Sequence, residues 1–322
     1  MTSEAAATGD SMSVASRPIN ELNQSERTAS MLATRRRTPF KVWLRRSGGR
    51  HIFATLAAIF SLYPVVWIVS ASFNASDSLA SARLIPRNVT FDNFTGLFND
   101  SVSPIGRWMW NSVYIAVAAA TINVLVAAFA AYAFSRFEFR GRRALLTSLL
   151  VMQIFPQFLG FIAFFVMSQQ LGEVIPAIGF NTHAFLILVY IGGAAGFNAF
   201  LLKGFLDSVP KSLDEAARID GASALVIFFR IIIPLARPML AVIFMISFIA
   251  TFSEFILASF LLSGTDNLTL PIGLQAFLGQ GYNARWGLLA AVSLLSAAPI
   301  VIIFIVAQKH IIGGLTAGGV KG

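Results

Sequence analysis

The sequence has no cysteine among its 322 residues, which excludes a disulfide framework, a thiol nucleophile, a cysteine-ligated zinc site and an iron–sulfur cluster. Histidine is almost as scarce. Its three copies, His51, His183 and His310, are widely separated, and each lies near the end of an apolar run. Because a metal site needs several ligands that converge on one point, we expect three ordinary interfacial residues and no metal site.

Charged residues are also few, at 12% of the chain, whereas hydrophobic residues make up 56%. The mean hydropathy is +0.73. A water-soluble globule of this length does not need so much apolar surface, and the composition is typical of a membrane protein. The lipid bilayer is therefore the expected solvent for most of the chain.

A helix that spans a hydrocarbon core of about 30 Å needs roughly 20 apolar residues. Six such runs lie approximately at residues 52–73, 109–134, 145–167, 184–202, 240–262 and 286–307. They are continuous rather than alternating, which favours helices over a β-barrel. We predict an all-α, polytopic protein with six transmembrane helices. In the fourth run, Gly192 and Gly196 are one helical turn apart and predict a flat face for close helix packing.

Lysine and arginine are distributed very unequally between the two predicted sides of the membrane. With both termini in the cytoplasm, 20 of the 24 basic residues lie on the cytoplasmic side. The outer loops hold only Arg83, Arg87, Arg107 and Arg285. This asymmetry follows the positive-inside rule and predicts an N-in, C-in topology. The net charge of +9 is then explained by topology and anionic lipid headgroups, not by nucleic acid.

Residues 1–50 are rich in serine, threonine, alanine and arginine, so we expect a mobile tail on the cytoplasmic side. Their charged region is too long for a cleaved signal peptide, and no small-residue cleavage site follows at the expected place. The first span is therefore expected to remain as an anchor, with a kink at Tyr63-Pro64.

Polar residues inside the apolar runs are candidates for a transport pathway or for helix packing. Glu254 is the only acid well inside a predicted span, where a carboxylate must be paired or wetted. A gate or cavity role and a helix-packing role both remain open for it. Ser253 and Gln157 are further cavity candidates. Hydrogen bonds between helices are expected for most of the other polar residues, which include Asn111, Asn123, Gln153, Asn198 and Ser293.

The segment between the fourth and fifth spans predicts two short helices. Pro210 suits a first helical turn, where its missing N–H costs nothing, and Asp214 and Glu215 complement the positive helix end. The first helix should end at Asp220-Gly221, because glycine tolerates the left-handed conformation that closes a helix. Arg218 lies one turn after both acids, so either pair can form on one exposed face.

The spacing in this segment resembles the EAA motif of ABC-importer permease subunits, with isoleucine at position 233 where the motif prefers leucine. In that family the loop forms coupling helices that dock into a cleft on a separate ATPase subunit. An interfacial hairpin without a partner is the alternative. The resemblance implies ATPase-coupling roles for Glu215, Ala216, Ala217, Asp220, Gly221, Ile231, Ile233 and Pro234.

The resemblance covers about residues 51–322 and is closest from Gly204 onward. It narrows to carbohydrate importers, and within them to the smaller permease subunit of maltose transporters, the MalG type. The segments that carry it are Phe91 to Phe98, Trp108 to Ser112, Ser247 to Ala250 with Glu254, Trp286-Gly287, Pro299-Ile300 and the glycine-rich end, Gly314 to Gly322.

Two segments near the C-terminus have roles that this resemblance implies. The C-terminal tail would reach into the interface of the ATPase dimer through Gly314, Thr316, Gly318, Gly319 and Lys321. A solvated tail is the alternative. The outer loop between the last two spans would enter the sugar cleft of an extracellular binding protein through Phe277, Gly279, Gln280, Tyr282 and Asn283.

The implied assembly is a binding-protein-dependent sugar importer in a prokaryotic inner membrane. Its other members would be a second, MalF-like permease, a MalK-like ATPase dimer that holds ATP and magnesium, and the sugar-binding protein. No lysine of this chain lies in a Walker A loop, so we expect no P-loop ATP site here. We also expect no cofactor and no enzymatic activity in this chain, because the resemblance implies that ATP hydrolysis belongs to the partner ATPase. Maltose, maltodextrin and trehalose-like glycosides all remain open as substrates.

Three segments are predicted: the tail 1–50, a permease domain 51–307 with a coupling loop at 204–237, and a C-terminal tail 308–322. An ion-coupled secondary transporter or channel is the alternative function, although no internal repeat is clear. A membrane enzyme is a third possibility. It would need a cluster of converging catalytic groups, and the spans contain none that we can identify.

Overall fold

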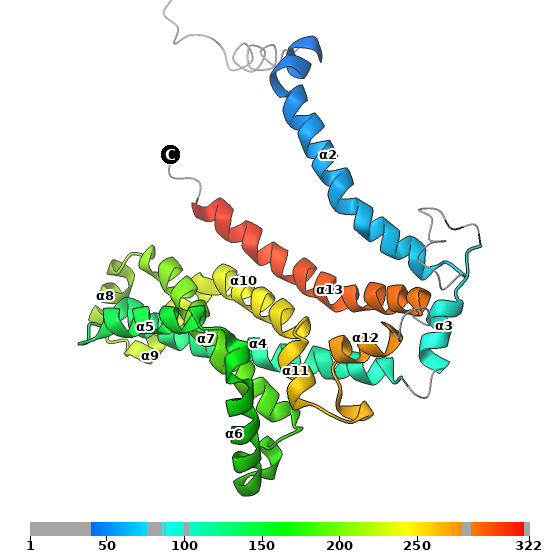
Figure 1. Cartoon of the computed structure of the whole chain (residues 1–322). Coiled ribbons are helices and arrows are strands. Elements are labelled where there is room, and N and C mark those ends of the chain that lie inside the picture. Colours follow the sequence, from blue (N-terminus) through cyan, green and yellow to red (C-terminus); the bar gives the residue numbers. More distant parts are fainter. Residues whose placement is uncertain (1–39, 76–85, 87, 100–102, 279–284, 319–322) are drawn as a thin grey trace, which may run out of the picture. The chain divides into compact units, whose positions relative to one another are not determined.

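The computed structural model describes residues 40–75, 86, 88–99, 103–278 and 285–318 (Figure 1). This part of the chain is almost wholly helical, and its one β pairing is an isolated bridge between Asn74 and Val89. The chain divides into two units, residues 1–63 and 64–322. Helix α2 (Phe40–Ser72) crosses the division, which falls at Pro64, where the sequence predicts a kink.

Five helical stretches among the described residues are long and apolar enough to cross a membrane. They are Gly48–Ser72 within α2, α4 (Ile105–Arg136), α7 (His183–Asp207), the stretch Ala224–Phe252, and Trp286–Lys309 within α13 (Trp286–Gly318). Helices α5 (Arg142–Ile154) and α6 (Phe161–Val174) supply a sixth if they count as one broken span. The predicted all-α fold with six membrane helices agrees with this architecture.

The third predicted span, however, is not one continuous helix. The helical stretches on either side of Phe155-Pro156 are bent by 86° relative to each other. Pro156 has no N–H to donate and disfavours the helical conformation at Phe155, whose ψ of 128° is extended. A short 3-10 helix, η3 (Gln157–Gly160), then leads into α6. An apolar run reports hydropathy and not backbone direction, so the prediction of one uninterrupted helix was wrong.

Helix α4 packs most extensively against α7 and α10 (Ile233–Phe252). Small side chains let the helix axes approach closely, and the buried face of α4 is rich in alanine. At the centre of this packing, the buried amide of Asn198 donates to Asn123 Oδ1 at 2.8 Å and to Ser247 Oγ at 2.9 Å. One polar group thus joins α4, α7 and α10, in agreement with the expectation that polar residues inside the apolar runs bond between helices, although the sequence did not name the partners.

Of the two glycines predicted to form a flat packing face on the fourth span, only Gly196 lies close to another helix. A Cβ on Gly196 would lie 3.3 Å from the Leu149 carbonyl oxygen of α5, so this glycine permits close packing. A Cβ on Gly192 would meet nothing within 4 Å. The Gln153 amide of α5 donates to the Gly193 carbonyl at 2.8 Å, a predicted interhelical bond, whereas Ser293 donates to its own helix.

Short helices close the end of the bundle where α4 begins (Figure 1). Helix α3 (Asp92–Asn99) packs on α13 through Leu97, and its Asn93 amide donates to the Ser72 and Asn74 carbonyls. Helix α12 (Leu270–Leu278) packs on α4 and α13, with Gly273 directly against the Trp108 ring. The remaining short elements are η4 (Pro176–Ile178), α11 (Ile256–Leu261) and η6 (Thr265–Asn267).

Candidate functional site

The first helix of the predicted coupling loop is α8 (Ser212–Ile219), and it ends as the sequence predicts. Gly221 has a φ of +82°, the left-handed conformation that glycine tolerates. The Gly221 N–H donates to the Arg218 carbonyl at 3.0 Å, and the Ala222 N–H donates to the Ala217 carbonyl at 2.9 Å. This pair of bonds is a Schellman motif, which satisfies the last carbonyls of the helix and turns the chain sharply.

The second half of the loop differs from the prediction of a separate short helix. Helix α9 (Ala224–Ile227) continues through a π-helical turn, η5 (Phe228–Ile232), into α10. Because the backbone stays helical from Ala224 to Phe252, the fifth spanning stretch starts well before residue 240. Pro234 stands in the first turn of α10, and the wider π turn before it accommodates the proline ring. The early turns of this spanning stretch therefore contain Ile231, Ile233 and Pro234.

Aromatic packing holds α9 and η5 against α4. The Phe228 ring is buried and stacks on Phe129, with ring centroids 4.6 Å apart and planes inclined by 23°. Tyr132 also contacts this ring, and its hydroxyl donates to the Ala224 carbonyl at 3.2 Å. This arm of the loop is therefore anchored to α4 through Phe228, whereas the neighbouring Phe229 is largely exposed.

Helix α8 presents most of its surface outward. Glu215, Ala216 and Asp220 are exposed, Ala217 is half-buried, and the Ile219 side chain at the end of the helix is 86% exposed. Gly221 is exposed at the turn that follows. The residues that resemble the EAA motif thus form an accessible elbow, which we define as Ser212–Gly221.

Asp214 is the exception on α8, because it is buried. Its Oδ2 atom lies 2.6 Å from Nε of Arg136, the last residue of α4, and the two side chains are only 6% and 2% exposed. The sequence suggested an exposed pair with Arg218 instead. That expectation was wrong for Asp214, because the side chain points into the bundle where a residue distant in sequence meets it.

Glu254 lies in a break between two helices and not inside a continuous one. Helix α10 ends at Phe252 and α11 begins at Ile256. The Glu254 carboxylate accepts from the Leu257 N–H at 2.7 Å and the Ala258 N–H at 3.0 Å, so it caps α11. It also accepts from the Tyr190 hydroxyl of α7 at 2.6 Å. These contacts favour the packing role of the two roles left open, while Ser253 beside it is exposed.

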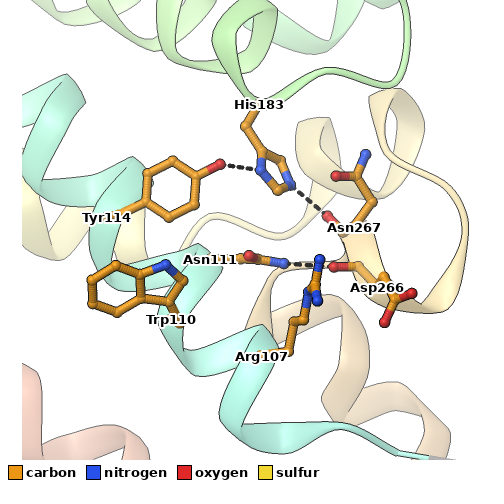
Figure 2. A pocket seen from close by; sticks show the side chains of 7 residues that line it. All are labelled: Arg107, Trp110, Asn111, Tyr114, His183, Asp266 and Asn267. Carbon is orange, nitrogen blue, oxygen red and sulfur yellow. Dashed lines mark hydrogen bonds between the residues drawn. The ribbon is translucent and has the colours of Figure 1, made fainter.

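A pocket of about 590 Å³ lies near the start of α4 (Figure 2). Asn111 donates to the Asp266 and Leu268 carbonyls at 3.0 and 2.9 Å. His183 Nε2 donates to the Asn267 carbonyl at 2.7 Å, so its Nδ1 accepts from the Tyr114 hydroxyl. These polar groups hold α4, α7 and η6 together. The exposed side chains that complete the lining are Arg107, Trp110 and Asp266.

The residues predicted to contact the binding protein and the ATPase dimer lie at the end of α12, in the loop after it and at the C-terminus. Gly279, Gln280, Tyr282, Asn283, Gly319 and Lys321 fall outside the described residues. Phe277 is buried in a core cluster, with the Arg285 guanidinium 5.9 Å from its ring centroid. The α13 backbone remains helical through Gly314, Thr316 and Gly318, and Gln157 begins η3. The roles proposed for the loop and the tail stay predictions.

Two groups of residues escaped the sequence reading. The Arg136–Asp214 pair was missed because the two residues lie on different helices, and the sequence around one residue gives no indication of the other. The lining of the pocket was missed because Tyr114, His183 and Asn267 come from three distant segments. The sequence does place Asp214 and Ala217 on one side of α8, one turn apart, but it does not indicate that this side faces the bundle.

Comparison with known proteins gives consistent results. Residues 123–312 match the family described as binding-protein-dependent transport system inner membrane component. The galactooligosaccharides transport system permease protein GanQ of Bacillus subtilis is 42% identical over 274 residues, which cover 84% of this chain and 94% of GanQ. The maltose/maltodextrin transport system permease protein MalG of Vibrio parahaemolyticus is 37% identical over 294 residues, which cover 88% of this chain and 97% of that protein.

A solved structure is also similar. It is the crystal structure of a bacterial ABC transporter involved in the import of the acidic polysaccharide alginate. One of its chains superposes with a TM-score of 0.69 at 25% sequence identity, covering 84% of this chain and 99% of that one.

Proposed function

The chain belongs to the family of inner-membrane components of binding-protein-dependent transport systems, and from this premise we propose that it is a permease subunit of a sugar ABC importer. It is a multi-pass membrane protein. The sugar would be an oligosaccharide, because the relatives are named for galactooligosaccharides and for maltose and maltodextrin. Binding assays with the cognate binding protein should begin with these two classes.

In this proposal the chain performs no chemistry. It forms the translocation pathway together with a second permease subunit, and an extracellular binding protein delivers the sugar. A separate ATPase dimer binds ATP and magnesium on the cytoplasmic side and supplies the work. Closure of that dimer displaces the elbow Ser212–Gly221, and the displacement passes into α4, α7 and α10, so that the pathway opens alternately to either side.

The exposed elbow is the observation that supports coupling. Glu215 and Ala216 are accessible, and the absence of bulk at Ala216 allows a partner surface to approach closely. The Ile219 side chain adds an apolar contact at the tip, where 86% of it is exposed. An exposed acid can pair with a basic group on a partner surface, and the small and apolar residues beside it allow that surface to pack closely.

The test is transport by the complete complex in proteoliposomes. Glu215→Lys reverses an exposed charge, and Gly221→Pro cannot adopt the observed φ of +82° because proline holds φ near −65°. Both variants should insert in the membrane and bind the second permease. Both should lose sugar uptake and the ATP hydrolysis that the binding protein stimulates. Glu138→Lys, the same reversal at an exposed residue outside the elbow, is the matched control and should transport normally.

Normal uptake by both elbow variants would contradict the coupling role. Sugar accumulation by vesicles that contain only this chain would contradict the ABC importer assignment and favour an ion-coupled transporter. Co-purification with an ATPase and a second permease, followed by transport that depends on ATP, is the expected result.

A further inference from the structure

Helix α8 has very little apolar surface with which to hold its position. Asp214 is its one buried residue among eight, and Ala217 contributes a half-buried methyl group. A helix this short is not stable by itself in water, so tertiary contacts must fix it. The position of α8 on the bundle therefore depends chiefly on what the Asp214 carboxylate contacts.

That contact is a single guanidinium which joins three segments. Arg136 Nε lies 2.6 Å from Asp214 Oδ2. Arg136 Nη1 donates to the Leu206 carbonyl in the last turn of α7 at 3.1 Å, and Nη2 donates to the Val209 carbonyl in the following connection at 3.2 Å. The end of α4, the end of α7 and the start of α8 are thus tied to one rigid, planar group.

Electrostatics favour this arrangement at both helix ends. The guanidinium lies at the negative C-terminus of α7, and the Asp214 carboxylate lies in the first turn of α8, where the helix is positive. Neither Asp214 Oδ1 nor Arg136 Nε has a hydrogen-bond partner among the described residues, so the contact of Nε with Oδ2 is an ion pair in which the two buried charges compensate each other. Removing one partner would leave the other charge buried and unpaired, which is a large perturbation.

The other arm of the loop is held independently. Phe228 packs on Phe129, and the Tyr132 hydroxyl donates to the Ala224 carbonyl, so α9 and η5 have contacts with α4 in which neither Arg136 nor Asp214 takes part. Between the two arms lies the exposed left-handed turn at Gly221. Loss of the pair would therefore release α8 about this turn while α9 and η5 remain anchored.

We infer that Arg136 and Asp214 form a clamp, the buried pair itself, that makes α8 move as one body with α4 and α7. The clamp transmits displacement of the elbow to the spanning helices. Without the ion pair, the ATPase would move α8 relative to α4 and α7, and the connection after α7 would bend in place of the spanning helices. Both are positioning residues, because neither is exposed to a partner or to the sugar. The inference rests on the proposed function, since it assumes that α8 is the part that the ATPase moves.

The measurement is the number of sugar molecules transported per ATP hydrolysed by the complete complex in proteoliposomes. Asp214→Asn and Arg136→Gln should lower this ratio by about tenfold or more, given the loss of one partner from a buried ion pair. Subunits should still co-purify, and ATP hydrolysis should continue. Lys203→Gln is the matched control, because it removes an ion pair at the same end of the bundle, Lys203 Nζ to Asp207 Oδ2 at 2.5 Å, that lies within α7 alone. Its ratio should equal that of the wild type.

A double variant keeps the test decisive even if the single variants misfold. Arg136→Met with Asp214→Leu removes both charges and fills the space with apolar groups, a replacement that often preserves stability. It should assemble, yet its ratio should remain low because the ion pair and the bonds of Arg136 to the Leu206 and Val209 carbonyls are lost together. A wild-type ratio in this assembled double variant would overturn the clamp, whether or not the single variants fold.

Glu215→Lys, measured in parallel, separates the two hypotheses. Loss of uptake by Glu215→Lys together with normal ratios in the Asp214 and Arg136 variants would refute the clamp and leave the proposed coupling intact. Normal uptake by Glu215→Lys and Gly221→Pro would refute the coupling itself, and the clamp with it.

Discussion

Substitution of Glu254 by alanine should destabilise the membrane domain by an amount that the structure allows us to estimate. The carboxylate caps α11 through two backbone N–H groups and accepts a third bond from the Tyr190 hydroxyl of α7. Loss of a helix cap costs about 1 kcal/mol, within a range of about 0.5–2. Loss of a hydrogen bond to a charged group costs about 1.5–3 kcal/mol. Together, Glu254→Ala should lower the free energy of unfolding by roughly 2–5 kcal/mol.

The assay is SDS-induced unfolding of the purified chain in mixed micelles. Tyr190→Phe removes only the hydroxyl and should cost about 1.5–3 kcal/mol. A double-mutant cycle should then give a coupling energy of about 1 kcal/mol or more, since the two side chains are in direct contact. Ser253→Ala, at the exposed neighbouring residue, is the control and should stay within about 0.5 kcal/mol of the wild type. Equal stability of Glu254→Ala and wild type would refute the capping argument.

The same residue offers a test of the role in transport. Glu254→Gln keeps the shape of the side chain but has one acceptor oxygen in place of two, so the domain should be less stable. If Glu254 is structural, a folded complex with this substitution should transport at the wild-type rate. A folded, assembled complex that fails to transport would instead assign Glu254 to the pathway.

Three other substitutions test the packing of the bundle. Gly273→Ala would place a Cβ 2.0 Å from the buried Trp108 ring and should lower the free energy of unfolding by about 1–3 kcal/mol or more. Gly204→Ala, at a helical position with open space around it, is the control and should be neutral or stabilising. Equal effects of the two substitutions would refute the close packing. Asn198→Ala removes the amide shared by three helices and should cost about 1–3 kcal/mol in the same unfolding assay, so an unchanged stability would argue against the shared bond. Phe228→Ala empties the aromatic anchor of α9 and should cost about 3–5 kcal/mol, which a wild-type unfolding midpoint would contradict.

The fold class could be predicted from the sequence because lipid imposes a simple rule. A chain with long apolar runs must satisfy its backbone bonds within each run, and helices do so locally. The ends of helices were less predictable. Pro156 bends the third apolar run by 86°, and the break after Phe252 interrupts the fifth. Hydropathy reports how apolar a run is and not where its backbone bends, so it marked neither break, although Ser253 and Glu254 lie at the second.

The elbow divides in the same way. Its turn was predictable, because the conformation at Gly221 is a property of glycine and of the residues beside it. The continuation of α9 through a π turn into α10 was not predicted, and Phe228 of this turn packs on α4, which is distant in the sequence. The coupling role of the elbow, the binding-protein loop and the C-terminal tail stay predictions.

By itself, the sequence determined the solvent, the helical class and the sharp turn at Gly221, since each depends on composition or on neighbouring residues. Only the tertiary structure decided which acid of α8 is buried and what it meets. Asp214 and Glu215 are adjacent and chemically alike, yet one is paired with Arg136 and the other is exposed. The difference arises because the bundle brings the end of α4 to one side of an eight-residue helix, and no local pattern encodes that side.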